Sequence, residues 1–169
     1  MINVLAIGRG PYSRDLDLCL TARALGASEI TFIGKTDKKL LKHLNALNKA
    51  WGGTFKVSFA KSYQEVIKSS SKYVKVCLTR YGIPLQNKIY ALKTYKNIVL
   101  IVPSSATKDV SKYTPDFSIS VTSQPHSGSA AVAIFLHEFY SGRELAMHFE
   151  NAKYKLVEKE NGLFQEMPK

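Results

Sequence analysis

The sequence predicts a single α/β domain in which helices flank a mostly parallel sheet, and three observations carry this prediction. Short apolar segments with strand character alternate along the chain with segments of helical periodicity. Residues 98–102 are entirely apolar and mostly β-branched, as is typical of a strand buried on both faces. The 169 residues suit one domain, and 45% hydrophobic with 22% charged residues is a globular composition.

The first part of the chain is expected to alternate strands and helices. Ile2–Ile7 and Glu29–Ile33 are short apolar segments of strand type. Residues 15–25 repeat apolar side chains at helical spacing and stop at Gly26, because glycine readily ends a helix. Residues 37–51 form the clearest predicted helix, with apolar side chains on one face, lysines on the other and two glycines after its end.

The rest of the chain continues the pattern. Residues 54–59 alternate as a strand does, and Ser62 with Glu65 forms a capping box that opens a short helix. Strands are further expected at residues 73–78, 98–102 and 117–121, and helices at residues 85–92 and 127–140. The chain is thus expected to form a domain over residues 1–152 and a C-terminal tail over residues 153–169, with a hairpin of residues 154–157 and 163–165 around Asn161-Gly162.

The charge favours a polyanionic partner. Lysine and arginine total 24 against 13 acidic residues, a formal net charge of +11 with a pI near 9.6. Nucleic acid is the commonest partner of such a surface, a membrane surface is a rarer one, and a merely soluble lysine-rich surface is an alternative. Only 5 of the basic residues are arginines, and three lie early in the chain: Arg9, Arg14 and Arg23. Lysines 38, 39 and 42 oppose the dipole of their predicted helix, which suits a solvated face or contact with an RNA backbone.

Several classes of protein are disfavoured by the sequence. Cys19 and Cys77 show no metal-ligand spacing and are expected to be buried free thiols in a reducing compartment. The four histidines lack zinc spacing, and no Ser-His-Asp set or pair of carboxylates stands out, which disfavours metalloenzymes and hydrolases. No segment approaches the ~20 apolar residues of a membrane span, and the N-terminus is not of signal type. We therefore expect a soluble, cytoplasmic protein without metal or membrane.

Ligands of parallel sheets bind beyond the carboxyl ends of the strands, so the segments that follow the predicted strands are the candidate sites. The first, residues 8–11, is not the dinucleotide fingerprint, because Ser13 stands where the third glycine is required. Residues 79–84, 103–107 and 122–129 are expected to be loops rich in Ser, Thr, Gly and Pro. The last opens a helix, whose first N–H groups favour an anionic or polar ligand, although each segment also suits an ordinary turn.

Four blocks resemble a known family in order and spacing. They are Leu-Thr-Ala-Arg-Ala-Leu-Gly-Ala at residues 20–27, Trp-Gly-Gly at 51–53, Leu-Thr-Arg-Tyr-Gly-Ile-Pro-Leu at 78–85, and Ser-Ile-Ser-Val-Thr-Ser-Gln-Pro-His-Ser at 118–127. The family is that of the archaeal tRNA cytidine-56 2′-O-methyltransferases, which belong to the SPOUT methyltransferases. The resemblance runs over nearly the whole chain. It implies a deep trefoil knot, S-adenosylmethionine held in that knot, a homodimer, and methyl transfer to a ribose 2′-OH of tRNA.

The resemblance also implies site residues. Cofactor contacts would fall on Leu78, Pro103, Ser104, Ser105, Ala106, Thr107, Val121, Thr122, Ser123, Gln124, Pro125, His126, Ser127 and Gly128. Arg23 matches an arginine proposed as catalytic in related ribose methyltransferases. Because its guanidinium stays charged, we expect Arg23 to clamp the neighbouring phosphate while that phosphate or a water accepts the proton, with Asp17 or His126 as alternative bases. Arg9 and Arg14 are candidates for RNA phosphate contacts or for no role at all.

The sequence departs from the family at three places. Asp17 stands where the family has a histidine, residues 103–107 lack the usual glycine and glutamate, and Gly128 replaces a glutamate. These departures leave alternatives open beside methylation of cytidine 56. The chain could be a SPOUT methyltransferase for another RNA position, or a non-catalytic dimeric RNA-binding protein of the same fold. An enzyme acting on a small nucleotide is a third reading.

Overall fold

A computed structural model describes residues 1–104, 109–154, 156 and 160 of the chain. The described residues form one sheet of six parallel strands in the order β3-β2-β1-β5-β4-β6. The strands are β1 (Ile2–Ile7), β2 (Glu29–Ile33), β3 (Lys56–Ala60), β4 (Val74–Pro84), β5 (Ile98–Pro103) and β6 (Phe117–Ser120). The predicted fold class, one α/β domain with a parallel sheet and flanking helices, is confirmed.

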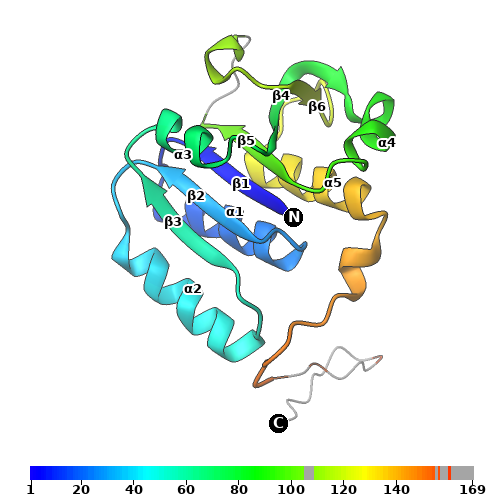
Figure 1. Cartoon of the computed structure of the whole chain (residues 1–169). Helices are drawn as coiled ribbons and strands as arrows, with labels where there is room; N and C mark the ends of the chain where they lie inside the picture. Colours follow the sequence, from blue (N-terminus) through cyan, green and yellow to red (C-terminus); the bar gives the residue numbers. More distant parts are fainter. Residues whose placement is uncertain (105–108, 155, 157–159, 161–169) are drawn as a thin grey trace.

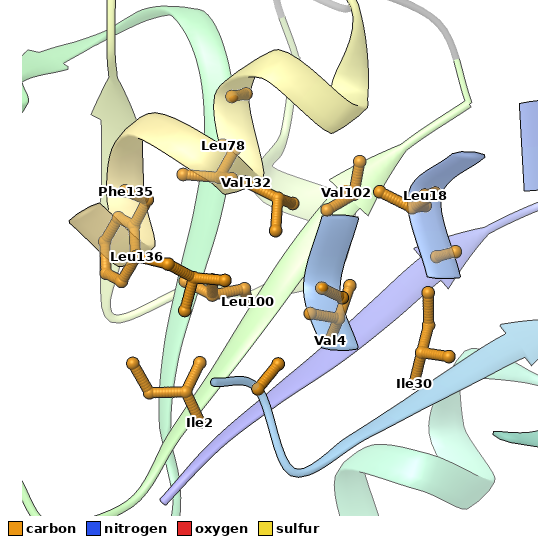
Figure 2. Close-up of a cluster of buried hydrophobic side chains, with 14 of the residues drawn as sticks. Ile2, Val4, Leu18, Ile30, Leu78, Leu100, Val102, Val132, Phe135 and Leu136 are labelled. Atoms are coloured by element: carbon orange, nitrogen blue, oxygen red, sulfur yellow. The ribbon is translucent and has the colours of Figure 1, made fainter. Parts of the chain in front are cut away.

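Helices cover both faces of this sheet (Figure 1). They are α1 (Tyr12–Ala24), α2 (Lys38–Trp51), α3 (Tyr63–Ser69), α4 (Ile89–Leu92) and α5 (Gly128–Tyr140), with three short 3-10 helices at Leu85–Asn87, Ser111–Tyr113 and Arg143–Ala146. The larger core lies under α1, α2, α4 and α5, and Figure 2 shows its centre, where Val4 and Leu100 of the sheet meet Leu18 of α1 and Phe135 of α5. The smaller core lies on the opposite face, under α3.

The alternation of side chains along the central strands explains the two cores. Val4 of β1 belongs to the larger core, and its neighbour Leu5 belongs to the smaller one, because successive side chains point to opposite faces. The two cysteines divide in the same way: Cys19 on α1 lies in the larger core and Cys77 on β4 in the smaller. Both are fully buried free thiols, as predicted.

The prediction of a loop at residues 79–84 is wrong, because β4 continues to Pro84. Its pairing with β6 shifts register between Leu78 and Ile83, which both pair with Ile119, so the residues between them bulge. Gly82 allows the two backbones to approach: a Cβ there would lie 2.6 Å from the nitrogen of Ile119. The glycine that suggested a turn thus serves a close contact between strands.

Two predicted helices also differ from those observed. The first begins at Tyr12 rather than at residue 15, because Pro11 supplies the backbone angle that suits a helix start. The helix expected over residues 85–92 is split into a 3-10 turn at Leu85–Asn87 and α4, with Lys88 between them. The helix over residues 37–51 is confirmed as α2, whose N-cap Asp37 accepts a hydrogen bond from the Leu40 nitrogen at 2.9 Å.

Beyond the last 3-10 helix, the chain passes the end of α2 (Figure 1). We call residues 147–154 the C-terminal strap. The Gly53 nitrogen donates to the Glu150 carbonyl and the Lys153 nitrogen to the Ala50 carbonyl, each at 2.9 Å. Gly52 makes this approach feasible, because its φ is +75° and a Cβ would lie 2.5 Å from the Glu150 oxygen. The strap is therefore fastened to the end of α2 by backbone contacts.

The predicted C-terminal hairpin, domain limits and knot are not tested by the structure. The hairpin expected at residues 154–157 and 163–165 falls mostly on residues outside the described ranges. The domain limits at residues 152 and 153 and the trefoil knot stay predictions. Over the described residues, none of the helices is both long and apolar enough to cross a membrane. The same residues contain no cluster of His, Cys, Asp or Glu that could hold a metal ion.

Candidate active site

Two neighbouring cavities lie beyond the carboxyl ends of the central strands, at the edge of the sheet where the sequence predicted a site. The first cavity, of about 200 Å³, is lined by Leu78, Thr79, Arg80, Val102, Pro103, Pro125, His126, Ser127, Gly128 and Ala131. The second, of about 260 Å³, is lined by Ala6, Ile7, Gly8, Arg14, Asp15, Asp17, Leu18, Val102, Pro103, Ser104, His126, Ser127, Gly128 and Ser129. A wall shared by both cavities thus joins them into one candidate site.

The shared wall consists of the end of β5 and the beginning of α5. Ser127 caps α5, since its hydroxyl oxygen accepts a hydrogen bond from the Ala130 nitrogen at 3.1 Å. Gly128 brings the helix close to the sheet, because a Cβ there would lie 2.9 Å from the Cγ1 of Val102. The first turn of a 13-residue helix therefore lines both cavities, and the positive end of its dipole favours anionic or polar ligand groups there.

Arg80 is the cation of the first cavity. Its Nε is buried and has no hydrogen-bond partner among the described residues, although the guanidinium lies 5.7 Å from the centre of the Tyr81 ring. A buried guanidinium N–H without a partner is costly, and a ligand carboxylate or phosphate would satisfy it. Arg80 was not predicted as a site residue. The signal that could have found it is an arginine directly after a buried strand in an arginine-poor chain.

Arg14 and Asp17, on the first turns of α1, face the second cavity. The Arg14 side chain is 46% exposed, and its nearest carboxylate oxygen, on Asp15, lies 3.7 Å away. Gly10 makes room for it, because a Cβ there would overlap the Arg14 guanidinium. Among the described residues, this long ion pair is the only one that Arg14 makes, so its guanidinium is accessible to a ligand such as an RNA phosphate.

Arg9 makes its described contacts within the protein. Its guanidinium donates to Asp15 at 2.6 Å and to Asp37 at 3.0 Å, and it lies 5.3 Å from the centre of the Phe32 ring and 4.9 Å from that of Phe59. Burial by itself lowers the pKa of Arg9, but the two carboxylates outweigh it and raise the pKa above its ordinary value. Asp15, which also accepts from the Gly10 nitrogen at 3.1 Å, fixes the loop below the second cavity. The predicted RNA contact of Arg9 stays a prediction, and its described contacts are structural.

Arg23 does not line either cavity. It lies at the other end of α1, is 6% exposed, and donates to Asn48 Oδ1 at 3.1 Å and to the Gly52 carbonyl at 2.6 Å. Its guanidinium also covers the ring of Phe149 in the C-terminal strap, and burial lowers its pKa. A catalytic role for Arg23 stays a prediction, and the described contacts join α1, α2 and the strap.

The structure brings together half of the predicted cofactor residues. Those that line a cavity are Leu78, Pro103, Ser104, Pro125, His126, Ser127 and Gly128. Val121, Thr122, Ser123 and Gln124 line neither, and the Thr122 carbonyl accepts a hydrogen bond from Ser120 at 2.9 Å, which shapes the turn. Ser105, Ala106 and Thr107 lie outside the described residues.

Comparison with known proteins identifies the family of this chain. The model of the family described as tRNA ribose 2′-O-methyltransferase, aTrm56, matches residues 51–164. The chain belongs to this family. The tRNA (cytidine(56)-2′-O)-methyltransferase of Methanothermobacter thermautotrophicus is 34% identical over 168 residues, covering 95% of this chain and 93% of the relative. The enzyme of the same name from Sulfurisphaera tokodaii is 38% identical over 151 residues, covering 86% and 88%. The family predicted from the four sequence blocks is confirmed.

Solved structures support the fold. The SpoU methyltransferase AviRb from Streptomyces viridochromogenes, in complex with the cofactor AdoMet, is similar with a TM-score of 0.60 at 15% identity. The similarity covers 85% of this chain and 57% of AviRb, so the chain spans little more than half of that protein. The likeness shows that the sheet and its helices share the fold of AviRb.

Proposed function

We propose that this protein transfers a methyl group from S-adenosylmethionine to a ribose 2′-OH of tRNA, with cytidine 56 as the target. The observation that carries the proposal is the pair of adjoining cavities, one with the buried Nε of Arg80 and one with the exposed Arg14. A two-substrate transfer needs two neighbouring sites, since orienting the two reactants supplies much of the rate. The names of the relatives support the same reaction and nucleotide.

The first cavity suits the cofactor. Leu78, Val102 and Ala131 offer an apolar wall, and the unpartnered Nε of Arg80 is a donor for the amino-acid carboxylate of S-adenosylmethionine. The beginning of α5 adds backbone donors to the same cavity. When bound, the cofactor supplies a methyl group on a positively charged sulfur, a strong electrophile.

The second cavity suits the ribose and its phosphate. Arg14 binds the phosphate next to the reacting nucleotide, because its guanidinium is half exposed and the described residues hold it by only a long contact to Asp15. We thus assign to Arg14 the clamp that the sequence analysis expected from Arg23. Asp17 and His126 both line this cavity, and each offers an acceptor for the proton of the 2′-OH.

The working unit is a homodimer in this proposal. Support comes from α1 and α5, which each expose an apolar side chain: Leu20 is 37% exposed and Ile134 39%. A second copy of the chain would cover such side chains. Sedimentation or light scattering at micromolar concentration measures the mass, and a monomer would contradict this part of the proposal.

The function is tested first by binding and transfer. Calorimetry should detect S-adenosylmethionine binding to the parent protein, and Arg80→Gln should weaken that binding by about tenfold, because a charge-assisted hydrogen bond is worth about 1.5 kcal/mol or more. Labelled methyl should then appear on unmodified tRNA, at the ribose of cytidine 56. Arg143→Gln, on an exposed turn away from both cavities, is the matched control.

Each alternative has its own result. Folded parent protein that retains tRNA but shows no heat with millimolar cofactor would be the non-catalytic RNA-binding relative. Methyl transfer that maps to another nucleotide would keep the reaction and reject the position. Unchanged cofactor binding by Arg80→Gln would reject the role of Arg80 alone.

A further inference from the structure

The outward face of α2 carries a stripe of lysines. Lys38, Lys42 and Lys49, the lysine stripe, are exposed and line a shallow surface hollow together with Leu41, Asn45 and Ala46. The hollow lies on the side of α2 that faces away from Leu40 and Leu44, which are buried in the larger core. The stripe is thus an accessible basic surface on the same layer as α1.

The protein itself leaves this charge uncompensated. The segment Lys38–Trp51 contains no acidic residue, and the described residues provide no ion pair for any lysine of the stripe. The nearest acidic residue, Asp37, is engaged by Arg9 at 3.0 Å and by the Leu40 nitrogen at 2.9 Å. Lys38, in the first turn, also opposes the helix dipole, so the fold gains nothing from its charge.

Aromatic contacts connect this surface to the second cavity. The Lys39 ammonium lies 4.4 Å from the centre of the Tyr12 ring, and the Tyr12 hydroxyl is 2.9 Å from His43 Nδ1. Tyr12 begins α1, two residues before Arg14. Cations therefore follow one another from the stripe, through Lys39, to the guanidinium that opens into the cavity.

The spacing of the stripe suits a nucleic-acid backbone. With a rise of about 1.5 Å per helical residue, Lys38 and Lys42 lie about 6 Å apart along the axis, and Lys49 about 10 Å further on. Such a row can neutralise several phosphates of one strand, and each neutralised phosphate releases counterions. The smaller apolar and amide side chains between the lysines leave the row open to a bulky partner.

We propose that the lysine stripe of α2 binds the sugar-phosphate backbone of the tRNA outside the reacting nucleotide and guides it toward Arg14. This inference rests on the proposed function for the identity of the RNA. It assigns affinity to α2 and leaves cofactor binding and chemistry to the two cavities. A surface of this kind contributes salt-dependent affinity without sequence preference.

The test compares two triple variants of equal charge change. Lys38→Gln, Lys42→Gln and Lys49→Gln together remove the stripe, and glutamine keeps the helix because its propensity is close to that of lysine. Lys61→Gln, Lys68→Gln and Lys72→Gln together are the control, because these exposed lysines lie at or near α3, on the opposite face of the sheet. The measurement is the affinity for unmodified tRNA between low and moderate salt.

The stripe variant should bind tRNA at least about tenfold more weakly near 0.1 M salt, and its slope of log K against log salt should fall by roughly 2 to 3. The control should stay within about twofold of the parent, and both variants should bind S-adenosylmethionine as the parent does. Equal losses in the two variants, or no loss in the stripe variant, would overturn the inference. A parent that binds tRNA through the stripe but never methylates it would reject the proposed function alone.

Discussion

The two ends of α1 each hold an arginine, and the surroundings of the two arginines are opposite. At the beginning of the helix, the Arg14 side chain is 46% exposed and makes one long ion pair within the described part of the chain. At the end, Arg23 is 6% exposed and donates to Asn48 and to the Gly52 carbonyl. The two positions are about 13 Å apart along the helix axis. One end is open to a ligand, and the other is closed by the C-terminal strap.

The difference teaches that residues by which a family is recognised can also hold the fold together. Arg23 and Gly52 belong to two of the recognisable sequence blocks, and here they bond to each other. Phe149 of the strap covers the Arg23 guanidinium at 4.7 Å. These blocks build one packed corner, whereas the first turns of α1, which carry Arg14, line the second cavity.

The largest expected effect is a loss of stability when the contact between the end of α2 and the C-terminal strap is disrupted. Gly52→Ala should destabilise the protein by about 3 kcal/mol, because the new Cβ would meet the strap backbone at a positive φ that alanine tolerates poorly. Gly142→Ala is the matched control: its φ of +79° is similar, but a Cβ there would find its nearest neighbour 3.6 Å away. Urea unfolding measures both. Equal losses in the two variants would mean that backbone strain, not the strap, governs this corner.

Substitution of the two arginines should affect different properties, namely methyl transfer for Arg14 and stability for Arg23. Arg14→Gln should lower methyl transfer by about 100-fold, as loss of a positioned cation does, with stability within about 0.5 kcal/mol of the parent. Arg23→Gln should instead cost about 2 kcal/mol of stability, since the buried Gly52 carbonyl and the part-buried Asn48 Oδ1 lose their charged donor. Single-turnover transfer and urea unfolding separate the two effects. A stable but inactive Arg23→Gln protein would restore the catalytic role that the sequence predicted for Arg23.

The smallest effect concerns the loop at the open end. The Leu40 nitrogen, with Arg9, holds the pKa of Asp37 below its ordinary value, so ionised Asp37 stabilises the folded protein above about pH 4. This contribution is lost as the pH falls through the lowered pKa of the folded state. Asp37→Asn keeps the helix cap and removes the charge, so its melting temperature should lie slightly below that of the parent at pH 7. Melting curves between pH 7 and pH 2.5 should show the gap closing in acid, and a constant gap would contradict the assignment.

The sequence predicted most of the fold because its signals are local. Runs of β-branched residues mark β1, β2 and β5, and Asp37 with the leucine face marks α2. The sequence did not predict the extension of β4, because Gly82 is required there by its close contact with the backbone of β6, more than thirty residues away. Local pattern favours a turn at such a glycine, and only the pairing of distant strands overrides it.

The candidate site was predicted in part for the same reason. The position beyond the strand ends and the capped beginning of α5 follow from the sequence, so Ser127 and Gly128 fall where expected. The separation of Arg14 from Arg23 depends on the strap, and no local signal says where residues 147–154 pack. Arg80 was not singled out from the sequence, because only the folded structure shows that its Nε is buried without a hydrogen-bond partner among the described residues.

Each face of the sheet contains one buried cysteine, whose reaction with an alkylating reagent can report when that face opens. Burial raises the pKa of Cys19 and of Cys77 to about 12, so almost no thiolate is present near neutral pH while the protein stays closed. Alkylation of a buried thiol then waits for local opening. Cys19 reports the opening of the layer of α1, and Cys77 that of the opposite face. Peptide mapping after brief alkylation would therefore follow the two faces of one sheet separately, without any engineered label.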